Sequence, residues 1–429
     1  MNKSRLFFIG LLLSLPVFAE EPLPLPDAIR IAMQNNPSIQ VVRNNAANVK
    51  NLARMGNAGL YPNITLSAGA TYAEDESQIA PRDAATTVNS QIQATYTLFD
   101  GFGNIYRWKA LRSESNSSEA DAQNQIESII LQVADAYYQT AAAIENMQIA
   151  DELIRISNER YDRAVNRSEF GRARTIDVLS AQVDLNADSV SWERAILQRD
   201  QNMRQLNLLL FKDISTETQV DTTIHVEMRW SLEEIKKMSL NNNAALEAAQ
   251  ERERQARYTY HASLTNHLPK LDLSASYGYQ QYNYDWDLAY DDPYRTARVG
   301  ATLSFNLFNG FRTDIQRQNA KRNLENQALI TEQALRALEQ DAANLFQSFE
   351  TSLTVWNLAK RNLTVAQLNF QRTEELYQLG QVTTTQFREA QLNLAQAKSQ
   401  LSTAKYEAKL NELSILRLAG RLVAKDEMN

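Results

Sequence analysis

Residues 95–104 read TYTLFDGFGN, and residues 304–313 read SFNLFNGFRT. The turn Leu-Phe-(Asp/Asn)-Gly-Phe therefore occurs twice in one chain of 429 residues, at a spacing of 209 residues. This spacing is far longer than the roughly 20–50 residues of solenoid repeats. The duplicated turn indicates two copies of one large structural unit.

The residues inside the turn predict a change from strand to helix. A side-chain oxygen of Asp100 or Asn309 can accept a hydrogen bond from the first turn of a following helix. Gly101 and Gly310 permit the sharp backbone bend that such a junction needs. We therefore expect each turn to be the point at which a strand ends and a helix begins.

Other positions repeat at nearly the same offset, which extends the duplication to the whole chain. Segment 27–40 is similar to 234–247 at an offset of 207 residues. Further positions recur 209 residues later: Gly171, Thr175, Ala181, Gln182 and Leu185 match Gly380, Thr384, Ala390, Gln391 and Leu394. We predict a first repeat over 20–219 and a second over 220–429.

Long stretches without Gly or Pro predict unusually long helices. Gly103 and Gly171 enclose 67 such residues, and Gly310 and Gly380 enclose 69. A helix of that length would extend for about 100 Å at 1.5 Å per residue. We predict long helices over 101–169 and 310–378, and shorter helices over 27–59, 173–211, 231–266 and 382–419.

The last of these helices carries the residue spacing of a coiled coil. Its apolar and small residues step by three and four: they are Phe387, Ala390, Leu394, Ala397, Leu401, Ala404 and Ala408. A second stripe of this kind runs beside the first. We therefore expect this helix to have neighbours on two sides.

Four segments alternate apolar and polar residues, which predicts strands with two different faces. They cover 62–73 and 87–98 in the first repeat, and 270–280 and 296–307 in the second. Each has about eleven residues, a length that suits a tilted strand crossing a bilayer. A half-buried sheet of a soluble protein is the alternative interpretation.

Four strands cannot close a membrane barrel, because an open edge in lipid leaves backbone groups unpaired. Two chains would give eight strands with a filled interior, and three would give twelve strands around a lumen. The polar strand faces favour a wet lumen. We therefore expect three chains, with Ala301 facing lipid and Thr302 facing the lumen.

The N-terminus and the composition indicate an exported protein. Residues 1–19 show the basic start, the apolar run and the small-residue end of a signal peptide. A membrane anchor is the alternative, but an apolar run of ten residues is too short to span a bilayer. The chain contains no cysteine, and its net charge of −7 argues against nucleic acid as a partner.

The sequence contains no motif of enzymatic chemistry that we could identify. His225, His261 and His267 show no metal-ligand spacing, and neither a phosphate-binding loop nor a nucleophile turn occurs. We therefore expect neither an enzyme nor a cofactor. The acidic segment 279–294 either binds Ca²⁺ through its aspartates or forms a solvated external loop.

In the order and spacing of these features, the chain resembles the TolC family of outer-membrane efflux and type I secretion channels. The segments that carry the resemblance, besides the duplicated turn, are LPDAIRIAMQNNPSIQ at 25–40, YPNITLSAGATY at 61–72, FGRARTIDVLSAQ at 170–182 and LGQVTTTQFREAQ at 379–391. The resemblance implies an α+β membrane protein. Each chain would supply four strands to a twelve-stranded trimeric barrel and long coiled-coil helices to a periplasmic tunnel.

The resemblance also implies a location and partners. The chain would form a homotrimer in contact with the lipid of a Gram-negative outer membrane, with its helices in the periplasm. It would dock onto a periplasmic adaptor (a membrane fusion protein) and an inner-membrane transporter of the ABC or RND type. The energy for transport would come from these partners, and the chain would be a passive conduit.

An aperture near the two hairpin turns is a further implication of the resemblance. In the family a tyrosine and an aspartate help to hold the aperture shut, and by their place in the motifs they correspond to Tyr377 and Asp177. A second family latch uses an arginine, which Val382 replaces here. Of the two acidic rings of the family, Gln386 replaces the first and Glu389 keeps the second. Solvated helix residues are the alternative interpretation of these positions.

The turns at the far end of the tunnel are the expected contact with the adaptor. If each glycine instead only closes a helical turn, the turns have a structural role alone. The residues concerned are Gly171, Arg172 and Arg174 in the first repeat, and Gly380 and Gln381 in the second.

Two other functions remain open at the level of the sequence. One is a structural or adhesive outer-membrane protein whose helices are spacers, and the other is a soluble periplasmic coiled-coil scaffold. The sequence does not identify the cargo, although the form of the duplicated turn favours type I secretion over drug efflux.

Overall fold

A computed structural model of the chain describes residues 22–75, 83–170, 174–284 and 293–423. The predicted signal peptide therefore lies outside the described residues. The chain forms two compact units, and each unit contains segments from both repeats. Unit 1 comprises residues up to 36 together with 130–226 and 352–410, and unit 2 comprises 37–129, 227–351 and the residues from 411 onward.

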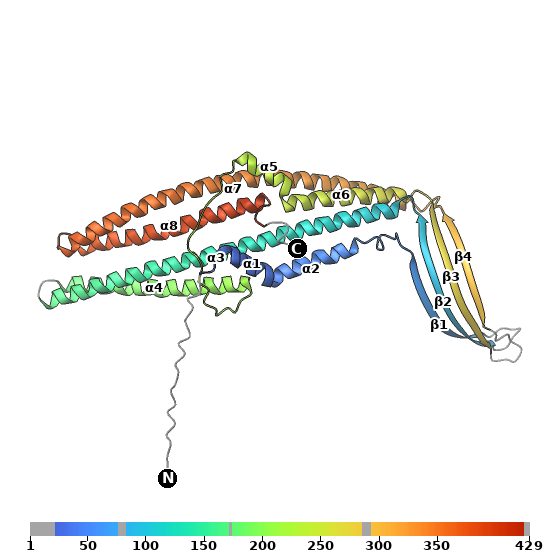
Figure 1. Cartoon of the computed structure of the whole chain (residues 1–429), viewed down its shortest axis with the longest axis horizontal. Coiled ribbons are helices and arrows are strands. Elements are labelled where there is room, and N and C mark those ends of the chain that lie inside the picture. Colours follow the sequence, from blue (N-terminus) through green and yellow to red (C-terminus); the bar gives the residue numbers. More distant parts are fainter. Residues whose placement is uncertain (1–21, 76–82, 171–173, 285–292, 424–429) are drawn as a thin grey trace, which may run out of the picture. The chain divides into compact units, whose positions relative to one another are not determined.

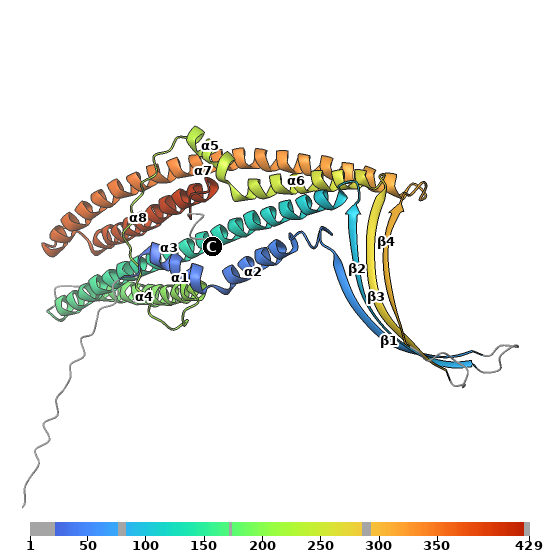
Figure 2. The same cartoon turned by 45° about the vertical axis from the view of Figure 1, so that its right-hand side comes forward.

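Unit 2 contains one antiparallel sheet of four strands in the order β1-β2-β3-β4 (Figures 1 and 2). Strands β1 and β4 are its edges. The strands are β1 (Asn63–Asp75), β2 (Asp83–Phe99), β3 (Lys270–Tyr284) and β4 (Tyr294–Ser304).

The two hairpins of the sheet have the same register. Ala68 of β1 is opposite Ser90 of β2, and Ala275 of β3 is opposite Val299 of β4. Ala275 lies 207 residues after Ala68, and Val299 lies 209 residues after Ser90, which are the offsets of the repeat. The duplication seen in the sequence is therefore also a duplication of strand pairing.

Each strand contributes its apolar residues to one face of the sheet, because the alternation is in phase across all four strands. Leu66 is opposite Ile92, which is in turn opposite Tyr277. The polar residues share the other face, where the Thr97 hydroxyl donates a hydrogen bond of 2.7 Å to Asp272.

Both duplicated turns place a Gly-Phe pair in the left-handed region of backbone space. Gly101 and Phe102 have φ values of 69° and 71°, and Gly310 and Phe311 have 67° and 60°. A left-handed backbone is rare for a residue as large as Phe. The sequence analysis anticipated the bend at the glycines but not at the phenylalanines.

Aromatic contacts accompany this backbone geometry in both turns. Phe102 packs edge to face on Phe99 with ring centroids 5.5 Å apart, and Phe311 packs in the same way on Phe308 at 5.3 Å. Such pairs contribute about 0.5–1.5 kcal/mol beyond burial of their area. The second Phe of each motif therefore helps to hold the turn.

The acceptor residue of each turn lies where the sequence analysis expected it. The Asp100 carboxylate accepts a hydrogen bond of 2.8 Å from the Asn104 backbone N–H. The Asn309 side chain accepts a longer bond, 3.5 Å, from the Thr313 backbone N–H. Long helices begin at these points.

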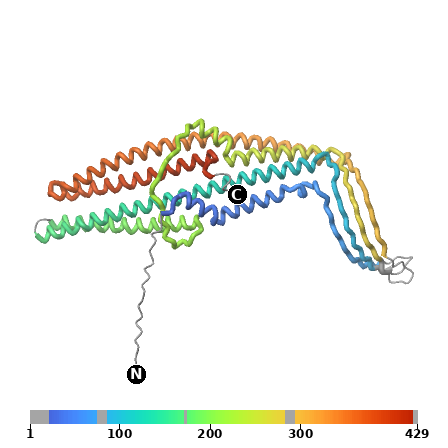
Figure 3. The backbone as a smooth tube through the Cα atoms, viewed as in Figure 1, coloured from blue at the N-terminus to red at the C-terminus, as the bar shows by residue number. Residues whose placement is uncertain are grey.

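Two long helices follow the turns, α3 (Gly103–Glu169) and α7 (Arg312–Gln378), each of 67 residues. Each folds back on a shorter helix, so that α3 pairs with α4 (Thr175–Leu210) and α7 pairs with α8 (Thr384–Leu418) (Figure 3). None of the described helices combines the length and the apolar character that a bilayer crossing requires.

The helix that precedes each strand pair differs from the expected continuous helix. In the first repeat it is divided into α1 (Leu25–Asn35) and α2 (Pro37–Leu52), and in the second into α5 (Leu232–Asn242) and α6 (Ala244–Thr265). The break lies at Asn36 in one copy and at Asn243 in the other. Both asparagines have an extended backbone, with ψ values of 118° and 119°.

The two breaks have different local causes. A residue before proline disfavours the helical region, which explains the break at Asn36 before Pro37. Asn243 instead accepts a hydrogen bond of 3.0 Å from the Leu246 backbone N–H and so starts a new helix. Within unit 1 the Asn36 amide donates 2.8 Å to the Leu209 carbonyl, and within unit 2 the Asn243 amide donates 3.1 Å to the Leu418 carbonyl.

Candidate functional site

The turn between α7 and α8 closes through left-handed Gly380, whose φ is 73°. The Gly380 N–H donates to the Tyr377 carbonyl at 3.0 Å, and the Gln381 N–H donates to the Leu376 carbonyl at 2.8 Å. This double closure is the Schellman arrangement that ends many helices. A Cβ atom at Gly380 would meet nothing within 4 Å, so the backbone at this turn is open to solvent.

The turn between α3 and α4 is described only in part. Gly171 and Arg172, both expected adaptor contacts, lie outside the described residues. Arg174 is described: it directly precedes α4 and is exposed. The adaptor contact at the two turns therefore stays a prediction.

Asp177 and Gln386 take part in the first turns of α4 and α8. The Asp177 carboxylate accepts a hydrogen bond of 3.2 Å from the Arg174 backbone N–H. The Gln386 side chain accepts one of 2.9 Å from the Thr383 backbone N–H, and the Thr383 hydroxyl accepts from the Gln386 N–H at 3.3 Å. Both residues thus stabilise a helix start in the manner of a capping box.

Tyr377 belongs to an apolar cluster between α7, α8 and α3. Its ring stacks on Phe387 with centroids 4.6 Å apart, and the cluster also contains Phe370 and Leu394. Among the described residues, no hydrogen bond joins Tyr377 to Asp177. The latch between these two residues therefore stays a proposal.

Glu389 lies on the exposed side of α8, as does Gln386. Glu389 has no ion pair among the described residues. Its exposure leaves Glu389 available to face a duct in an assembly, and the acidic ring stays a proposal.

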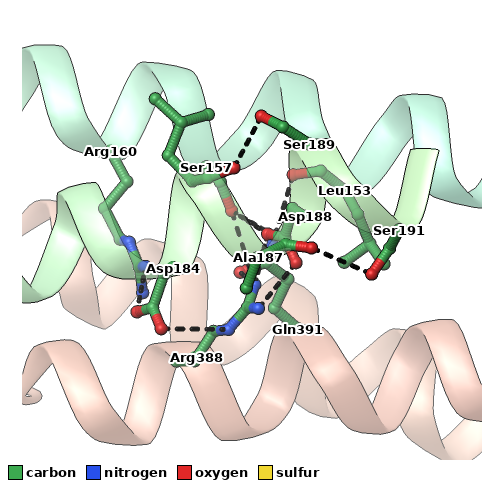
Figure 4. Close-up of polar contacts among 11 residues, drawn as sticks. Leu153, Ser157, Arg160, Asp184, Ala187, Asp188, Ser189, Ser191, Arg388 and Gln391 are labelled. Atoms are coloured by element: carbon green, nitrogen blue, oxygen red, sulfur yellow. Dashed lines mark hydrogen bonds and ion pairs between the residues drawn. The ribbon is translucent and has the colours of Figure 1, made fainter. Parts of the chain in front are cut away.

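A cluster of buried charges lies further along the same helices, and the sequence analysis did not find it (Figure 4). Arg388 of α8 makes a bidentate ion pair with Asp188 of α4, with both N–O distances 2.7 Å. The exposed fractions of the two side chains are 15% and 5%. Bidentate pairs of this kind combine strength with a fixed geometry.

Neutral groups of α3 and α8 surround this pair. The Ser157 hydroxyl donates 2.5 Å to the Asp188 carboxylate. The Gln391 amide donates 3.4 Å to the Ser157 hydroxyl and 3.3 Å to the Leu153 carbonyl. The cluster therefore joins α3, α4 and α8 within unit 1.

A second ion pair completes the cluster. Arg160 of α3 pairs with Asp184 of α4, and Arg388 approaches the same carboxylate at 3.9 Å. Only 3% of the Arg160 side chain is exposed. Its Nε atom is buried without a hydrogen-bond partner in the described part of the chain.

One signal in the sequence could have pointed to this cluster. Asp184 and Asp188 are four residues apart, so they lie on one face of α4, and like charges at this spacing repel. A carboxylate pair of this kind, in which Asp188 is buried, requires a cation opposite it. The sequence alone does not show that Arg388, 200 residues away from Asp188, supplies one of them.

The described residues contain no group of three or more His, Asp or Glu side chains that could hold a metal ion. The aspartates considered as Ca²⁺ ligands lie outside the described residues, and the choice between a Ca²⁺ site and a solvated loop stays open: they are Asp285, Asp287, Asp291 and Asp292.

Comparison of the sequence with known proteins identifies a family to which it is similar. Residues 28–210 and 236–421 match a family model described as outer membrane efflux protein. The chain is 24% identical over 382 residues to outer membrane protein TolC of Salmonella enteritidis, which covers 86% of this chain and 76% of that protein. It is 22% identical over 398 residues to the alkaline protease secretion protein AprF of Pseudomonas aeruginosa, covering 90% and 82%.

A solved structure with the same fold is the CmeC outer membrane channel of Campylobacter jejuni. The TM-score is 0.81 at 16% identity, and the match covers 93% of this chain and 86% of that one. The likeness confirms the fold class predicted from the sequence, α+β with four strands and long helical hairpins.

Proposed function

The chain belongs to the outer membrane efflux protein family, and on that premise we propose that three copies of it join edge to edge to enclose a duct. Membership in the family places the chain in the outer membrane of a Gram-negative cell, as the exit duct of an export system. In the proposed assembly each copy supplies four strands of a twelve-stranded barrel and its helical hairpins line a periplasmic tunnel.

The observation that carries the proposal is the repeated strand pairing. Strands β1 and β4 are sheet edges, and an edge in lipid leaves backbone groups without partners. By the offsets of the repeat, β4 is the second copy of β2 and β1 is the first copy of β3. The pairing of β2 with β3 inside one chain is therefore a template for pairing β4 with β1 of the next copy.

The template gives a register residue by residue. Thr95 is opposite Ser274 within the chain. Adding 209 to the first position and subtracting 207 from the second gives Ser304 opposite Ser67 of a neighbouring copy.

The helices of unit 1 support the same assembly. Inside the chain Leu394 of α8 packs near Ile156 of α3. The repeat equivalents of these residues are Leu185 of α4 and Val365 of α7, and Val365 is 66% exposed in the single chain. Exposed apolar residues also continue along α4: they are Ile176, Leu179, Val183, Val190 and Leu197. Burial of such a stripe against a neighbouring copy removes apolar area from water, at about 25 cal/mol per Å².

The duct is passive, and we propose that a periplasmic adaptor docks at the Gly380 turn and links it to an energised inner-membrane transporter. The likeness to a protease secretion protein favours a polypeptide as cargo. Small-molecule efflux is the alternative cargo class, and a deletion strain distinguishes the two. Loss of a secreted protein from the medium indicates the first, and sensitisation to toxic compounds alone indicates the second.

Cysteine cross-linking tests the assembly, because the chain has no cysteine of its own. We expect Ser304→Cys with Ser67→Cys to form covalent dimers and trimers on oxidation in outer membranes. Ser304→Cys with Thr65→Cys is the matched control, since it shifts the pair by two residues on the same face. Equal cross-linking in both variants, or a ladder that ends at dimers, would contradict the proposed assembly.

A further inference from the structure

We propose that Arg298 of three copies forms a ring of positive charge in the lumen of the barrel, and that this ring binds the carboxylates of acidic polypeptide segments as they pass. This inference rests on the proposed function, because it needs the closed barrel of three copies. It deepens that function by naming a residue that determines which cargo the duct favours.

Arg298 lies on the polar face of the sheet, near the middle of β4. It is opposite Ser276 of β3, and Asp272 further along β3 belongs to the same face because side chains alternate along a strand. The Arg298 side chain is exposed in the single chain. In the proposed barrel the polar face lines the lumen, so each copy presents one guanidinium group to the duct.

The residues around Arg298 are small. Its partner on β3 is a serine, and Gly300 is the next residue on the same face of β4. Asn89 is opposite Gln280 within the chain, and their repeat equivalents are Arg298 and Ala73. The register proposed between copies therefore places an alanine of the neighbouring copy on the other side of Arg298. These neighbours leave the guanidinium group free to contact a solute.

The charge of Arg298 is not compensated by another residue of the sheet. Lys270 and Asp272 also lie on the polar face, but they form an ion pair of 3.0 Å with each other. The Thr97 hydroxyl donates a further hydrogen bond to Asp272. Arg298 has no ion pair among the described residues. Where the structure describes the side chains of the polar face, Arg298 is thus the one charge available to a passing molecule.

The repeat puts a neutral residue at the equivalent position of the first hairpin. Asn89 lies 209 residues before Arg298, and it is opposite Gly69 in the same register in which Arg298 is opposite Ser276. A barrel of three copies would therefore alternate three arginines with three asparagines at equivalent positions of its hairpins. The ring would carry three positive charges, and every member of it has N–H donors.

The chemistry of such a ring favours carboxylates. Guanidinium groups bind carboxylates through paired N–H donors, and pores that select anions use rings of Arg or Lys side chains. A single carboxylate contacts one Arg298. A segment with several carboxylates can contact more than one Arg298 at once, which raises the effective concentration of the later contacts. The ring therefore favours an acidic polypeptide over a small anion.

Charged thiol reagents can measure the electrostatic potential at the ring, because the chain has no cysteine of its own. Ser276→Cys places a thiol opposite Arg298. Its reaction rates with a sulfonate-bearing and a trimethylammonium-bearing methanethiosulfonate are measured on purified trimers, and their ratio is taken. We expect Arg298→Gln to lower the ratio of the anionic to the cationic rate about fivefold at low salt.

Arg295→Gln is the matched control for this measurement. Arg295 lies opposite Tyr279 on the apolar face of the same strand, so the substitution removes the same charge from the side that faces lipid. We expect it to leave the ratio of rates unchanged.

Binding of carboxylates is tested by the current through single trimers in planar bilayers, with a hexaglutamate peptide added on the barrel side. We expect the peptide to interrupt the current of the wild type and of Arg295→Gln, and to act about tenfold more weakly on Arg298→Gln. Asn89→Arg doubles the charges of the ring and should strengthen the block. Free glutamate at the same concentration of carboxylate groups should not block.

Each outcome decides the matter. A ratio of rates unchanged in Arg298→Gln, equal block of wild type and Arg298→Gln, or no block of the wild type would overturn the cationic ring. Equal block by free glutamate would refute a polypeptide ligand. If Arg298→Gln fails to assemble, Asn89→Arg decides, since a block no stronger than that of the wild type also contradicts the ring. A wild-type protein that forms no trimer and no channel would instead count against the proposed function.

Discussion

Asp177 and Gln386 occupy the same position in the two halves of the chain. They are 209 residues apart, and each is the third residue of the helix that follows a hairpin turn. Each accepts a hydrogen bond from the backbone N–H of the residue that precedes its helix. Any latch function of Asp177 is therefore superimposed on a helix-capping function that Gln386 performs without a charge.

This relationship shapes the test of the proposed latch. Asp177→Asn removes the charge but keeps an oxygen that can accept the capping bond, and Tyr377→Phe removes a hydroxyl but keeps the ring stacked on Phe387. If the latch exists, the double variant should raise single-channel conductance several-fold at normal trimer yield.

The control for the latch is Gln386→Ala, which removes the equivalent cap from α8 without touching the latch. Loss of a cap costs about 0.5–2 kcal/mol. If the double variant conducts like the wild type, other residues hold the aperture and the assignment of Tyr377 and Asp177 is wrong.

Substitutions at Gly380 can distinguish a role in adaptor docking from a role in turn closure alone. Asn tolerates the left-handed backbone better than most residues, and a side chain here meets nothing within 4 Å. Gly380→Asn should therefore preserve the trimer. We expect export to fall because the side chain occupies the docking surface.

Gly380→Val is the comparison, since a β-branched residue strains the left-handed turn. The docking role would be refuted if Gly380→Asn exports normally, or if trimer yield and export fall together in both variants.

The two faces of the sheet predict opposite tolerance to charge. Ala301 lies opposite Leu273 on the apolar face, and Thr302 lies opposite Asp272 on the polar face. Arginine facing lipid at mid-bilayer costs about 2–4 kcal/mol, whereas arginine in the lumen costs little. We expect Ala301→Arg to lower assembled trimer and Thr302→Arg to leave it unchanged, as judged on unheated gels. The reverse order would show that the apolar face does not contact lipid.

The sequence was sufficient for the features that local chemistry determines. The bend at Gly101 and the alternation of Leu66 with Thr65 depend on neighbouring residues, and a single sequence carries both. The break at Asn36 also had a local signal in Pro37. The break at Asn243 had a weaker local signal, the preference of Asn for the residue that caps a helix start, and its hydrogen bond to Leu418 lies 175 residues away.

The charge cluster could not be predicted for the same physical reason. A helical period shows that Asp184 and Asp188 share a face, but it does not show which helix covers that face. The partner Arg388 lies on a helix of the other repeat, and its neighbour Glu389 is exposed. Tertiary packing alone determines that one of two adjacent charged residues is largely covered and the other is solvated.

Gly101 lies close to Leu268, just after the end of α6, so a second substitution at Leu268 should compensate for a larger residue at 101. A Cβ atom at Gly101 would lie 2.6 Å from Leu268 Cδ1, whereas one at Gly310 would meet nothing within 4 Å of the single chain. We expect Gly101→Ala to reduce the yield of folded protein, and Leu268→Ala to restore part of it. Leu268→Ala should not restore Gly310→Ala, whose penalty comes from backbone strain. A rescue of both variants would mean that Leu268 acts on stability in general.

The raised pKa of Tyr137 predicts that unit 1 loses stability at alkaline pH. Its hydroxyl donates 2.7 Å to the Leu23 carbonyl and accepts 2.9 Å from the Asp221 N–H. Burial raises the pKa of Tyr137 from 10.0 to about 12, so folding favours the neutral phenol. This contribution is complete below pH 10 and is lost as the pH rises through about 12.

Tyr137→Phe should lower the free energy of unfolding by about 1–3 kcal/mol near neutral pH, because it removes the hydrogen bonds of a buried hydroxyl. It should also weaken the fall in thermal stability between pH 10 and 12, measured by circular dichroism in detergent. Burial and the Glu145 carboxylate raise the pKa of Tyr406 as well, so part of the fall should remain. Tyr161→Phe, at a half-buried position of the same helix, should leave the pH profile unchanged. A profile for Tyr137→Phe that is parallel to that of the wild type would show that Tyr137 does not limit alkaline stability.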